Sequence, residues 1–455
     1  MAIVAINPAT GETVQEYEEM SAAEAAEAVG KAHAAYLDWK RLSYGERALL
    51  VRELARVLRV DVDEHAQLIT AEMGKSIVES RAEIEKCAWA CEYYAEHTER
   101  ILADEVVPTE AHKSYIAHRP LGVVLAVMPW NFPYWQVLRF AAPAVMAGNA
   151  GVLKHASNVP GSALAIEKVF RQAGFPEHLF RTLLIGSGQV AAIIENPHVR
   201  AVTLTGSTPA GRAVATKAGE MLKKTVLELG GSDPYIILED ADLAAAAASC
   251  VAGRLGNAGQ SCVAAKRFVV VEAVREEFEA LVIEGMKSRS MGDPLDESIQ
   301  IGPMARHDLR DELHEQVQKS IEKGARCLLG GEIPENKGAY YPPTLLTDVV
   351  PGMPAYSEEF FGPVASVISV KDEAEAISVA NSSVFGLGGA VFTRDIARGE
   401  RIAKEELESG CCFVNDFVRS DPRLPFGGVK ESGYGRELSD YGMKEFVNTK
   451  TVYIK

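Results

Sequence analysis

The stretch LGVVLAVMP, Leu121–Pro129, is a continuous apolar run near the first third of the chain. Runs of this kind are typical of strands that are buried on both faces of a parallel sheet. After Gly148 and Asn149 a second strand of the same kind is predicted, GVLKHAS at 151–157. Helical segments and apolar strands then alternate with short links. This alternation predicts an α/β protein with a parallel sheet covered by helices.

The same layout extends to both ends of the chain. Before the run, segments 22–39, 44–58 and 84–101 carry apolar residues at three-and-four spacing, which predicts helices. After it, the strand YIILED at 235–240 starts a second stretch of alternating strands and helices. The closing strand, TVYIK at 451–455, follows a glycine-rich loop, and pairing with another subunit would cover its edge.

Composition excludes several classes of protein. The 455 residues are enough for about three domains, and 47% hydrophobic with 24% charged residues is ordinary for a globular chain. A net charge of -16 without a basic patch argues against a nucleic-acid partner. The apolar runs are too short to span a bilayer, so no membrane is expected. Seven scattered cysteines and an amino terminus without a secretion signal predict a reduced, cytoplasmic protein without a metal site.

Two motifs carry the candidate chemistry, LELGGSDP at 227–234 and GNAGQSC at 256–262. Together they offer a carboxylate, Glu228, and a thiol in a glycine-flanked turn, Cys262. Such a pair suggests covalent catalysis, in which the thiolate attacks and the carboxylate later activates water. The alternative is that Glu228 is a solvated charge and Cys262 a small buried apolar residue.

Two further segments bear on a cofactor. GSTPAG at 206–211 follows the apolar strand AVTLT and opens a helix, so its backbone N–H groups could face a pyrophosphate. An ordinary strand-to-helix turn would have the same pattern. Lys154 ends its own strand, where its ammonium could reach a ribose or phosphate or could simply be solvated.

Six motifs together resemble one family. PWNFP (129–133), GSTPAG (206–211), LELGG (227–231), GQSC (259–262), EEFFGPV (358–364) and PFGGVKESGYGRE (425–437) occur in the order found in aldehyde dehydrogenases. The resemblance covers essentially the whole chain.

The resemblance implies a Rossmann-like cofactor domain interlocked with a second α/β domain, the catalytic domain, and a small β oligomerisation flap. The cofactor domain would comprise residues 1–109 and 121–229, and the catalytic domain residues 230–433. Residues 110–120 and 434–455 would form the oligomerisation strands of a homodimer or homotetramer.

The resemblance also assigns roles to residues. Cys262 would be the nucleophile, Glu228 the general base and Asn131 the oxyanion donor together with the backbone N–H of Cys262. Glu437 would belong to a proton path behind Glu228. Phe426 would line the mouth of the substrate tunnel. The residues that would bind the cofactor are Trp130, Lys154, Ser157, Gly206, Ser207, Gly211, Glu359 (nicotinamide ribose) and Phe361 (nicotinamide ring).

Ser157 indicates which nucleotide is used. Most similar NAD-using members have a glutamate three residues after the lysine that matches Lys154, where it binds the adenosine ribose. A carboxylate there would repel a 2′-phosphate, whereas Ser157 can donate to it and Lys154 can pair with it. NADP is therefore expected, with weaker use of NAD. A neutral serine that admits both cofactors is the alternative.

Arg139 and Ser420 indicate the substrate. Arg139 lies in the segment that lines the substrate tunnel of the family, and a guanidinium there implies an anionic group on the aldehyde. Ser420 matches a serine that binds the carboxylate in succinic semialdehyde dehydrogenases. The expected reaction is oxidation of succinic semialdehyde to succinate. Alternatively, Arg139 forms a salt bridge on a helix surface, and the enzyme is a broad-specificity NAD(P)-dependent dehydrogenase of small aldehydes.

The match departs from some succinic semialdehyde dehydrogenases in two places. Some of those enzymes have a second arginine six residues before the nucleophile, where this chain has Gly256. Some also have a second cysteine near the nucleophile that acts as a redox switch, but Val263 and Ala264 follow Cys262 here. Two other classes fit less well. A cysteine hydrolase or acyltransferase would need a histidine partner for Cys262 that the sequence does not offer. A non-catalytic protein of this fold would be expected to lose Cys262, Glu228 or Asn131.

Overall fold

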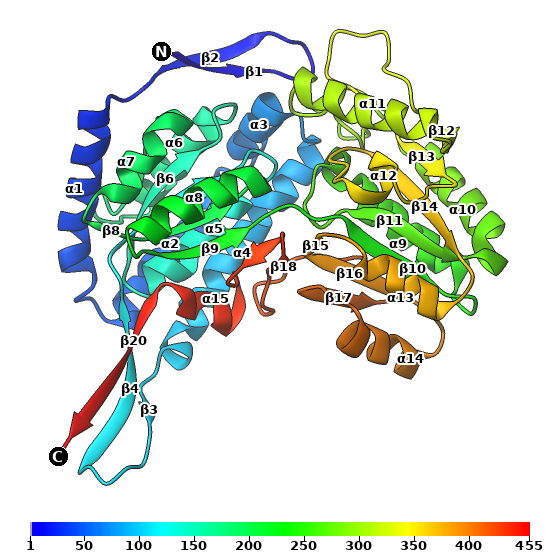
Figure 1. Cartoon of the computed structure of the whole chain (residues 1–455). Coiled ribbons are helices and arrows are strands. Elements are labelled where there is room, and N and C mark those ends of the chain that lie inside the picture. The colour runs from blue at the N-terminus through cyan, green and yellow to red at the C-terminus, as the bar shows by residue number, and fades with distance from the viewer. Residues whose placement is uncertain (1) are drawn as a thin grey trace.

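The first of two α/β bodies is built on a six-stranded sheet (Figure 1). The structure is a computed structural model and describes residues 2–455. Strands β5 to β9 run parallel, and β19 is antiparallel to β9. The spatial order is β19 (Gly433–Tyr434), β9 (Lys224–Glu228), β8 (Val199–Thr205), β5 (Val123–Met128), β6 (Ala150–His155) and β7 (Phe180–Thr182). The predicted apolar run therefore forms a central strand.

Helices cover both faces of this sheet. The segment predicted at 22–39 is helical over those residues, and Ser21 and Glu24 cap it reciprocally. The helix predicted at 84–101 begins earlier, at Ile77, because Ser76 accepts a hydrogen bond from the backbone N–H of Glu79. Within residues 2–455 no helix combines the length and the apolar character needed to cross a bilayer. The helices of this body are α1 (Ala22–Trp39), α2 (Tyr44–Val60), α3 (Val62–Met73), α4 (Ile77–Ile101), α5 (Trp135–Met146), α6 (Pro160–Gln172), α7 (Val190–Glu195), α8 (Thr208–Glu220) and α15 (Ser439–Glu445).

The second body is a seven-stranded sheet whose strands are parallel except β12, which is antiparallel to β13. The predicted α/β class is thus confirmed for both halves. The spatial order is β12 (Arg326–Leu329), β13 (Thr344–Thr347), β14 (Val364–Val370), β11 (Ala265–Val271), β10 (Asp233–Ile237), β16 (Gly388–Phe392) and β17 (Cys411–Val414). Its helices are α9 (Leu243–Leu255), α10 (Arg275–Lys287), α11 (His307–Glu322), α12 (Pro354–Ser357), α13 (Glu373–Asn381) and α14 (Ile396–Arg401).

A three-stranded antiparallel arm projects from the first body (Figure 1). It pairs β20 (Val447–Ile454) with β4 (Lys113–Pro120), and β4 with β3 (Glu105–Val106). The segment expected to form oligomerisation strands, 434–455, is thus divided, because Tyr434 pairs within the first sheet and α15 precedes β20. β20 lies at the edge of the arm, and its pairing with a second subunit stays a prediction.

Two short strand pairs and one loop complete the frame. A hairpin of β1 (Ala2–Ile6) and β2 (Thr13–Glu18) lies at the amino-terminal end, and β15 (Phe385–Gly386) pairs with β18 (Val429–Lys430). The loop before β11 carries Cys262, which packs against the hydrophobic core of the first body. The candidate thiol therefore belongs to one body and lies against the other.

Candidate active site

The turn that presents Cys262 has an unusual backbone. Asn257 and Ala258 have φ angles of 54° and 51°, in the left-handed region that non-glycine residues rarely adopt. Gly259 follows with a φ of 73°, and a Cβ there would overlap the carbonyl oxygen of Gly362. Such backbone persists only where surrounding contacts enforce it, and it is concentrated at functional sites.

Hydrogen bonds hold this turn against both bodies. The Asn257 amide donates to the carbonyl oxygens of Asn131, at 2.8 Å, and Gln260, at 3.1 Å. The backbone N–H of Asn257 donates to Glu79 Oε1 at 2.9 Å. Asn131 and Glu79 belong to the first body, so the thiol turn is fixed across the junction.

Two buried cationic side chains, Arg254 and Lys266, hold the other side of the turn by hydrogen bonds. Arg254 donates to the carbonyl oxygen of Gly259 at 2.8 Å and to that of Phe360 at 3.1 Å. Lys266 Nζ donates to the carbonyl oxygen of Cys262 at 2.7 Å and to Glu359 Oε1 at 3.0 Å. The thiol turn is therefore tied directly to the segment that carries the predicted nicotinamide-binding residues.

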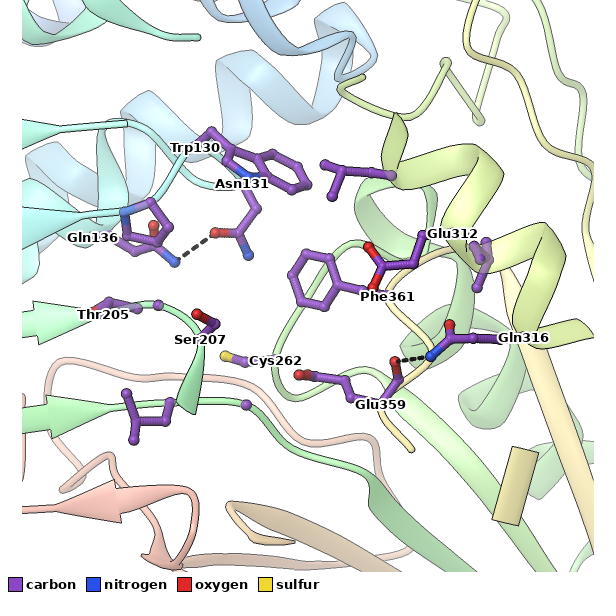
Figure 2. Close-up of a pocket in the computed structure, with 16 residues that line it drawn as sticks. Trp130, Asn131, Gln136, Thr205, Ser207, Cys262, Glu312, Gln316, Glu359 and Phe361 are labelled. Atoms are coloured by element: carbon purple, nitrogen blue, oxygen red, sulfur yellow. Dashed lines mark hydrogen bonds between the residues drawn. The ribbon is translucent and has the colours of Figure 1, made fainter. Parts of the chain in front are cut away.

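Asn131 lies beside the thiol with a fixed amide. Its Oδ1 accepts a hydrogen bond from Gln136 Nε2 at 2.9 Å (Figure 2). Its Nδ2 donates to the carbonyl oxygen of Gln260 at 3.0 Å. An amide nitrogen has two hydrogens, so one is left for another acceptor. Gln136 thus orients the Asn131 amide so that its nitrogen is available as a donor.

The first cavity, of about 280 Å³, lies at the carboxyl ends of the first sheet (Figure 2). In parallel α/β sheets, nucleotides bind at this edge. Ser207 is the residue immediately before α8, so this cavity meets a helix amino terminus. Of the residues predicted to bind the cofactor, those that line it are Trp130, Gly206, Ser207, Glu359 and Phe361.

The other three predicted cofactor residues are not among the residues lining this cavity. Lys154 lies half-buried near the end of β6, and burial lowers the pKa of its ammonium. Ser157 is exposed two residues beyond this strand. Gly211 lies inside α8, where a Cβ would be 2.6 Å from Leu229 Cδ2, so the structure gives it a packing role.

A second cavity, also of about 280 Å³, lies on the other side of the thiol. Cys262 lines both cavities, and Figure 2 shows its side chain between Ser207 and Glu359 in the first. All three predicted substrate residues, Arg139, Ser420 and Phe426, line the second. The thiol is therefore accessible from two separate binding spaces.

Arg139 lies deep in the second cavity rather than on a helix surface. Its side chain is 3% exposed and forms an ion pair with Glu437. Its Nη2 donates to Thr205 Oγ1 at 3.1 Å, and the guanidinium lies 5.1 Å from the centre of the Phe426 ring. The sequence offered a salt bridge on a helix surface as the alternative. Arg139 does form a salt bridge, but the prediction that it lies on the surface is wrong, because the pair is buried between α5 and the segment after β19.

Glu228 is buried but lines neither cavity. Within residues 2–455 neither of its carboxylate oxygens has a hydrogen-bond partner, and a Cβ on Gly427 would lie 2.6 Å from Oε1. Burial first, and then the neighbouring Glu437, raise the pKa of Glu228 well above its ordinary value, while Arg139 opposes them. The sequence predicted that Glu228 would lie in the space around the thiol. In this conformation the structure does not place it there.

The surroundings of the Cys262 thiol favour its neutral form. Burial raises its pKa to about 12, although Arg139 and Lys266 oppose that shift. A thiolate is the nucleophilic form, so attack by Cys262 requires a base or a nearby positive charge.

Comparison with known proteins settles the family. The sequence profile described as "Aldehyde dehydrogenase family" matches residues 1–452. The chain belongs to the aldehyde dehydrogenase family. The resemblance inferred from the six motifs is therefore confirmed.

Relatives of this aldehyde dehydrogenase have informative names. It is 50% identical over the full length of both chains to a Synechocystis protein named "Probable succinate-semialdehyde dehydrogenase", NADP(+) type. It is 48% identical to the succinate-semialdehyde dehydrogenase, NADP(+) type, of Mycobacterium avium, covering all of this chain and 97% of that one.

Solved structures extend the likeness to three dimensions. A succinic semialdehyde dehydrogenase from Streptococcus pyogenes in complex with NADP+ is 37% identical, with a TM-score of 0.97 over 99% of each chain. An NAD-dependent aldehyde dehydrogenase from Sinorhizobium meliloti has the same TM-score at 33% identity, covering 100% of this chain and 91% of that one. Since proteins described with either cofactor share the backbone, the cofactor depends on side chains.

Sequence reasoning missed several residues of this dehydrogenase site. The sequence did not single out Gln136, although Gln136 and Arg139, three residues apart, fall on one face of α5. Lys266 and Arg267 lie near the start of β11, a strand that is buried along its whole length, and a lysine in a buried strand is itself a signal. Lys86 lies in the segment 84–101, for which the sequence predicted only a helix, and it lines the second cavity.

Proposed function

We propose that this aldehyde dehydrogenase oxidises succinic semialdehyde to succinate with NADP+. The observation that carries the proposal is the position of Cys262 between two cavities, one at a nucleotide-binding sheet edge and one lined by cationic side chains. The names of the relatives at about half identity support the same reaction and the same cofactor.

The first chemical step belongs to Cys262 and Asn131. Cys262 first loses its thiol proton to solvent water, a loss that the charges of Arg139 and Lys266 favour. The thiolate then adds to the aldehyde carbon, and the carbonyl oxygen becomes an oxyanion in a thiohemiacetal. The free hydrogen on Asn131 Nδ2 and the backbone N–H of Cys262 supply donors for that charge. Because Gln136 and Gln260 already orient the amide, little reorganisation is required when the charge develops.

The residues at the first cavity fit a dinucleotide. Gly206 and Ser207 present the start of α8, Trp130 and Phe361 offer aromatic rings whose centroids lie 5.7 Å apart, and Glu359 offers a carboxylate. A bound nicotinamide would supply the acceptor for the hydride that leaves the substrate carbon. The chain's own part is to position Glu359, which accepts hydrogen bonds from Lys266 and the backbone N–H of Gly231, and Phe361 two residues later.

The thioester on Cys262 is then hydrolysed with Glu228 as the base. For this step its carboxylate must turn from its place beside Gly427 toward the thiol. Arg139 favours the charged form of Glu228 that acts as the base, against the larger influences of burial and Glu437. Water then adds to the thioester carbonyl and succinate leaves.

The reaction is tested by comparing succinic semialdehyde with butanal, which has the same chain length but no carboxylate. We expect kcat/KM with NADP+ to be about a hundredfold higher for the carboxylated aldehyde, since a charge-assisted hydrogen bond in a cavity contributes about 1.5–3 kcal/mol. The measurement is the initial rate of NADPH formation. Equal kcat/KM for the two aldehydes would instead support the broad-specificity dehydrogenase.

The role of Ser157 in cofactor preference is tested by replacing it with glutamate. Ser157→Glu is expected to lower kcat/KM for NADP+ at least about tenfold relative to NAD+, because like charges in contact cost several kcal/mol. Ser157 is exposed, so the fold should tolerate the change. Ser288→Glu, which adds the same charge to an exposed site in the second body, is the control. An unchanged cofactor ratio in Ser157→Glu would refute the role of Ser157.

A further inference from the structure

Lys86 extends from α4 into the second cavity, next to Ser420 and Arg139. Its Nζ donates to Ser420 Oγ at 2.8 Å and lies 4.3 Å from the centre of the Trp135 ring. Neither partner carries a negative charge. Within residues 2–455 this ammonium forms no ion pair, although it lines the same space as the reactive thiol.

The carboxylates that influence Lys86 have other partners. Glu83 forms a buried ion pair with Lys75 and accepts hydrogen bonds from the backbone N–H groups of Tyr134 and Trp135. Asp421 pairs with Arg423 at 2.6 Å. The positive charge of Lys86 is therefore not neutralised by the protein, which is costly for a poorly solvated cation.

Arg139, unlike Lys86, already has a negatively charged partner. Its guanidinium is paired with Glu437 and hydrogen-bonded to Thr205, so much of its charge and donor capacity is already used. An arriving carboxylate would compete with Glu437 for Arg139, whereas at Lys86 it would meet an ammonium held only by a hydroxyl and a ring. Ser420 can then donate its own hydrogen to the same carboxylate.

We propose that Lys86, together with Ser420, binds the distal carboxylate of the aldehyde substrate in the second cavity. This assignment rests on the proposed function and extends it from Arg139 to a second cation. Lys86 thereby selects ω-carboxy aldehydes, while Arg139 also maintains the charge balance near Glu437 and Glu228.

Lys86→Met tests the assignment, because methionine keeps the aliphatic stem beside Trp135 and removes only the charge. The ratio of kcat/KM for succinic semialdehyde to that for butanal is expected to fall about ten- to a hundredfold, through a higher KM for the carboxylated aldehyde. Lys86→Arg should retain most of the ratio. Lys168→Met, at an exposed lysine of α6, is the matched control.

Binding of succinate supplies a readout that does not depend on its precursor being turned over. Succinate is expected to inhibit butanal oxidation competitively, with an inhibition constant about ten- to a hundredfold higher in Lys86→Met than in the wild type. The same inhibition constant in both proteins would overturn the role of Lys86.

The pH profile separates Lys86 from a structural lysine. Burial, and to a lesser extent Arg139, lower the pKa of Lys86 to about 8, while Cys87, Asp421 and Glu83 oppose them. Lys75, Glu79 and Arg419 also face this cavity. As pH rises from 7 to 9 the ammonium loses its proton, so the succinic semialdehyde to butanal ratio should fall in the wild type. The guanidinium of Lys86→Arg remains charged, so its ratio should stay flat.

The outcomes distinguish the two proposals. A wild type without preference for succinic semialdehyde would refute the proposed function, and the role of Lys86 with it. A wild type with that preference, unchanged in Lys86→Met, would refute the role of Lys86 alone and leave Arg139 as the anchor.

Discussion

Replacing Cys262 by alanine is expected to abolish dehydrogenase activity, with a fall in kcat of about 10⁴-fold or more, because removal of an enzyme's nucleophile removes the whole covalent route. The thiol is at the junction of the two cavities, and the left-handed turn of Asn257 and Ala258 is fixed around it. The measurement is NADPH formation from succinic semialdehyde under saturating substrate.

Cys327→Ala is the matched control, since Cys327 is an exposed cysteine in the second body, on β12. It should retain wild-type activity. The Cys262→Ala protein should still bind NADP+, measured by calorimetry, because the residues expected to hold the nucleotide are unchanged. Substantial aldehyde oxidation by Cys262→Ala would contradict the proposed mechanism.

Glu228→Gln is expected to stall the enzyme after the first half of the reaction. Addition of the thiol and loss of hydride do not require the base that activates water, so one equivalent of NADPH should form rapidly. Steady-state turnover should then be about 10²- to 10⁴-fold slower, the usual contribution of a general base. Rapid-mixing kinetics would record the burst, and mass spectrometry of the intact protein would detect a succinyl thioester.

Glu315→Gln provides the comparison, because Glu315 is an exposed carboxylate on α11 that lines neither cavity. It should turn over normally. A Glu228→Gln enzyme that neither shows a burst nor accumulates a thioester would assign Glu228 to an earlier step.

The pH dependence of thioester hydrolysis follows from the raised pKa of Glu228. Burial and Glu437 favour its neutral form, so the base is lost as pH falls through a range well above that of an ordinary glutamate. Hydrolysis in the wild type should therefore slow toward acid pH in that range. The residual hydrolysis in Glu228→Gln should not slow toward acid pH in this way, because glutamine does not titrate.

Much of the molecule follows from local sequence patterns. The apolar run at 121–129 predicted a buried strand and became β5 at the centre of its sheet. The three-and-four spacing at 22–39 predicted α1. These predictions held because side-chain periodicity and burial act over a few neighbouring residues. The motifs also identified the family, since their order along the chain is itself a sequence property.

The sequence by itself determined the fold class, the family and the residue types available for chemistry, because these depend on periodicity and on the identity of each side chain. Only the tertiary structure decided how distant residues share a space. It paired Arg139 with Glu437 and left Glu228 out of the lining of both cavities. It also brought Lys86 into hydrogen-bond contact with Ser420, 334 positions later in the chain. Which charges are neutralised, and which remain for a substrate, depends on the packing of separate elements, and no local pattern encodes it.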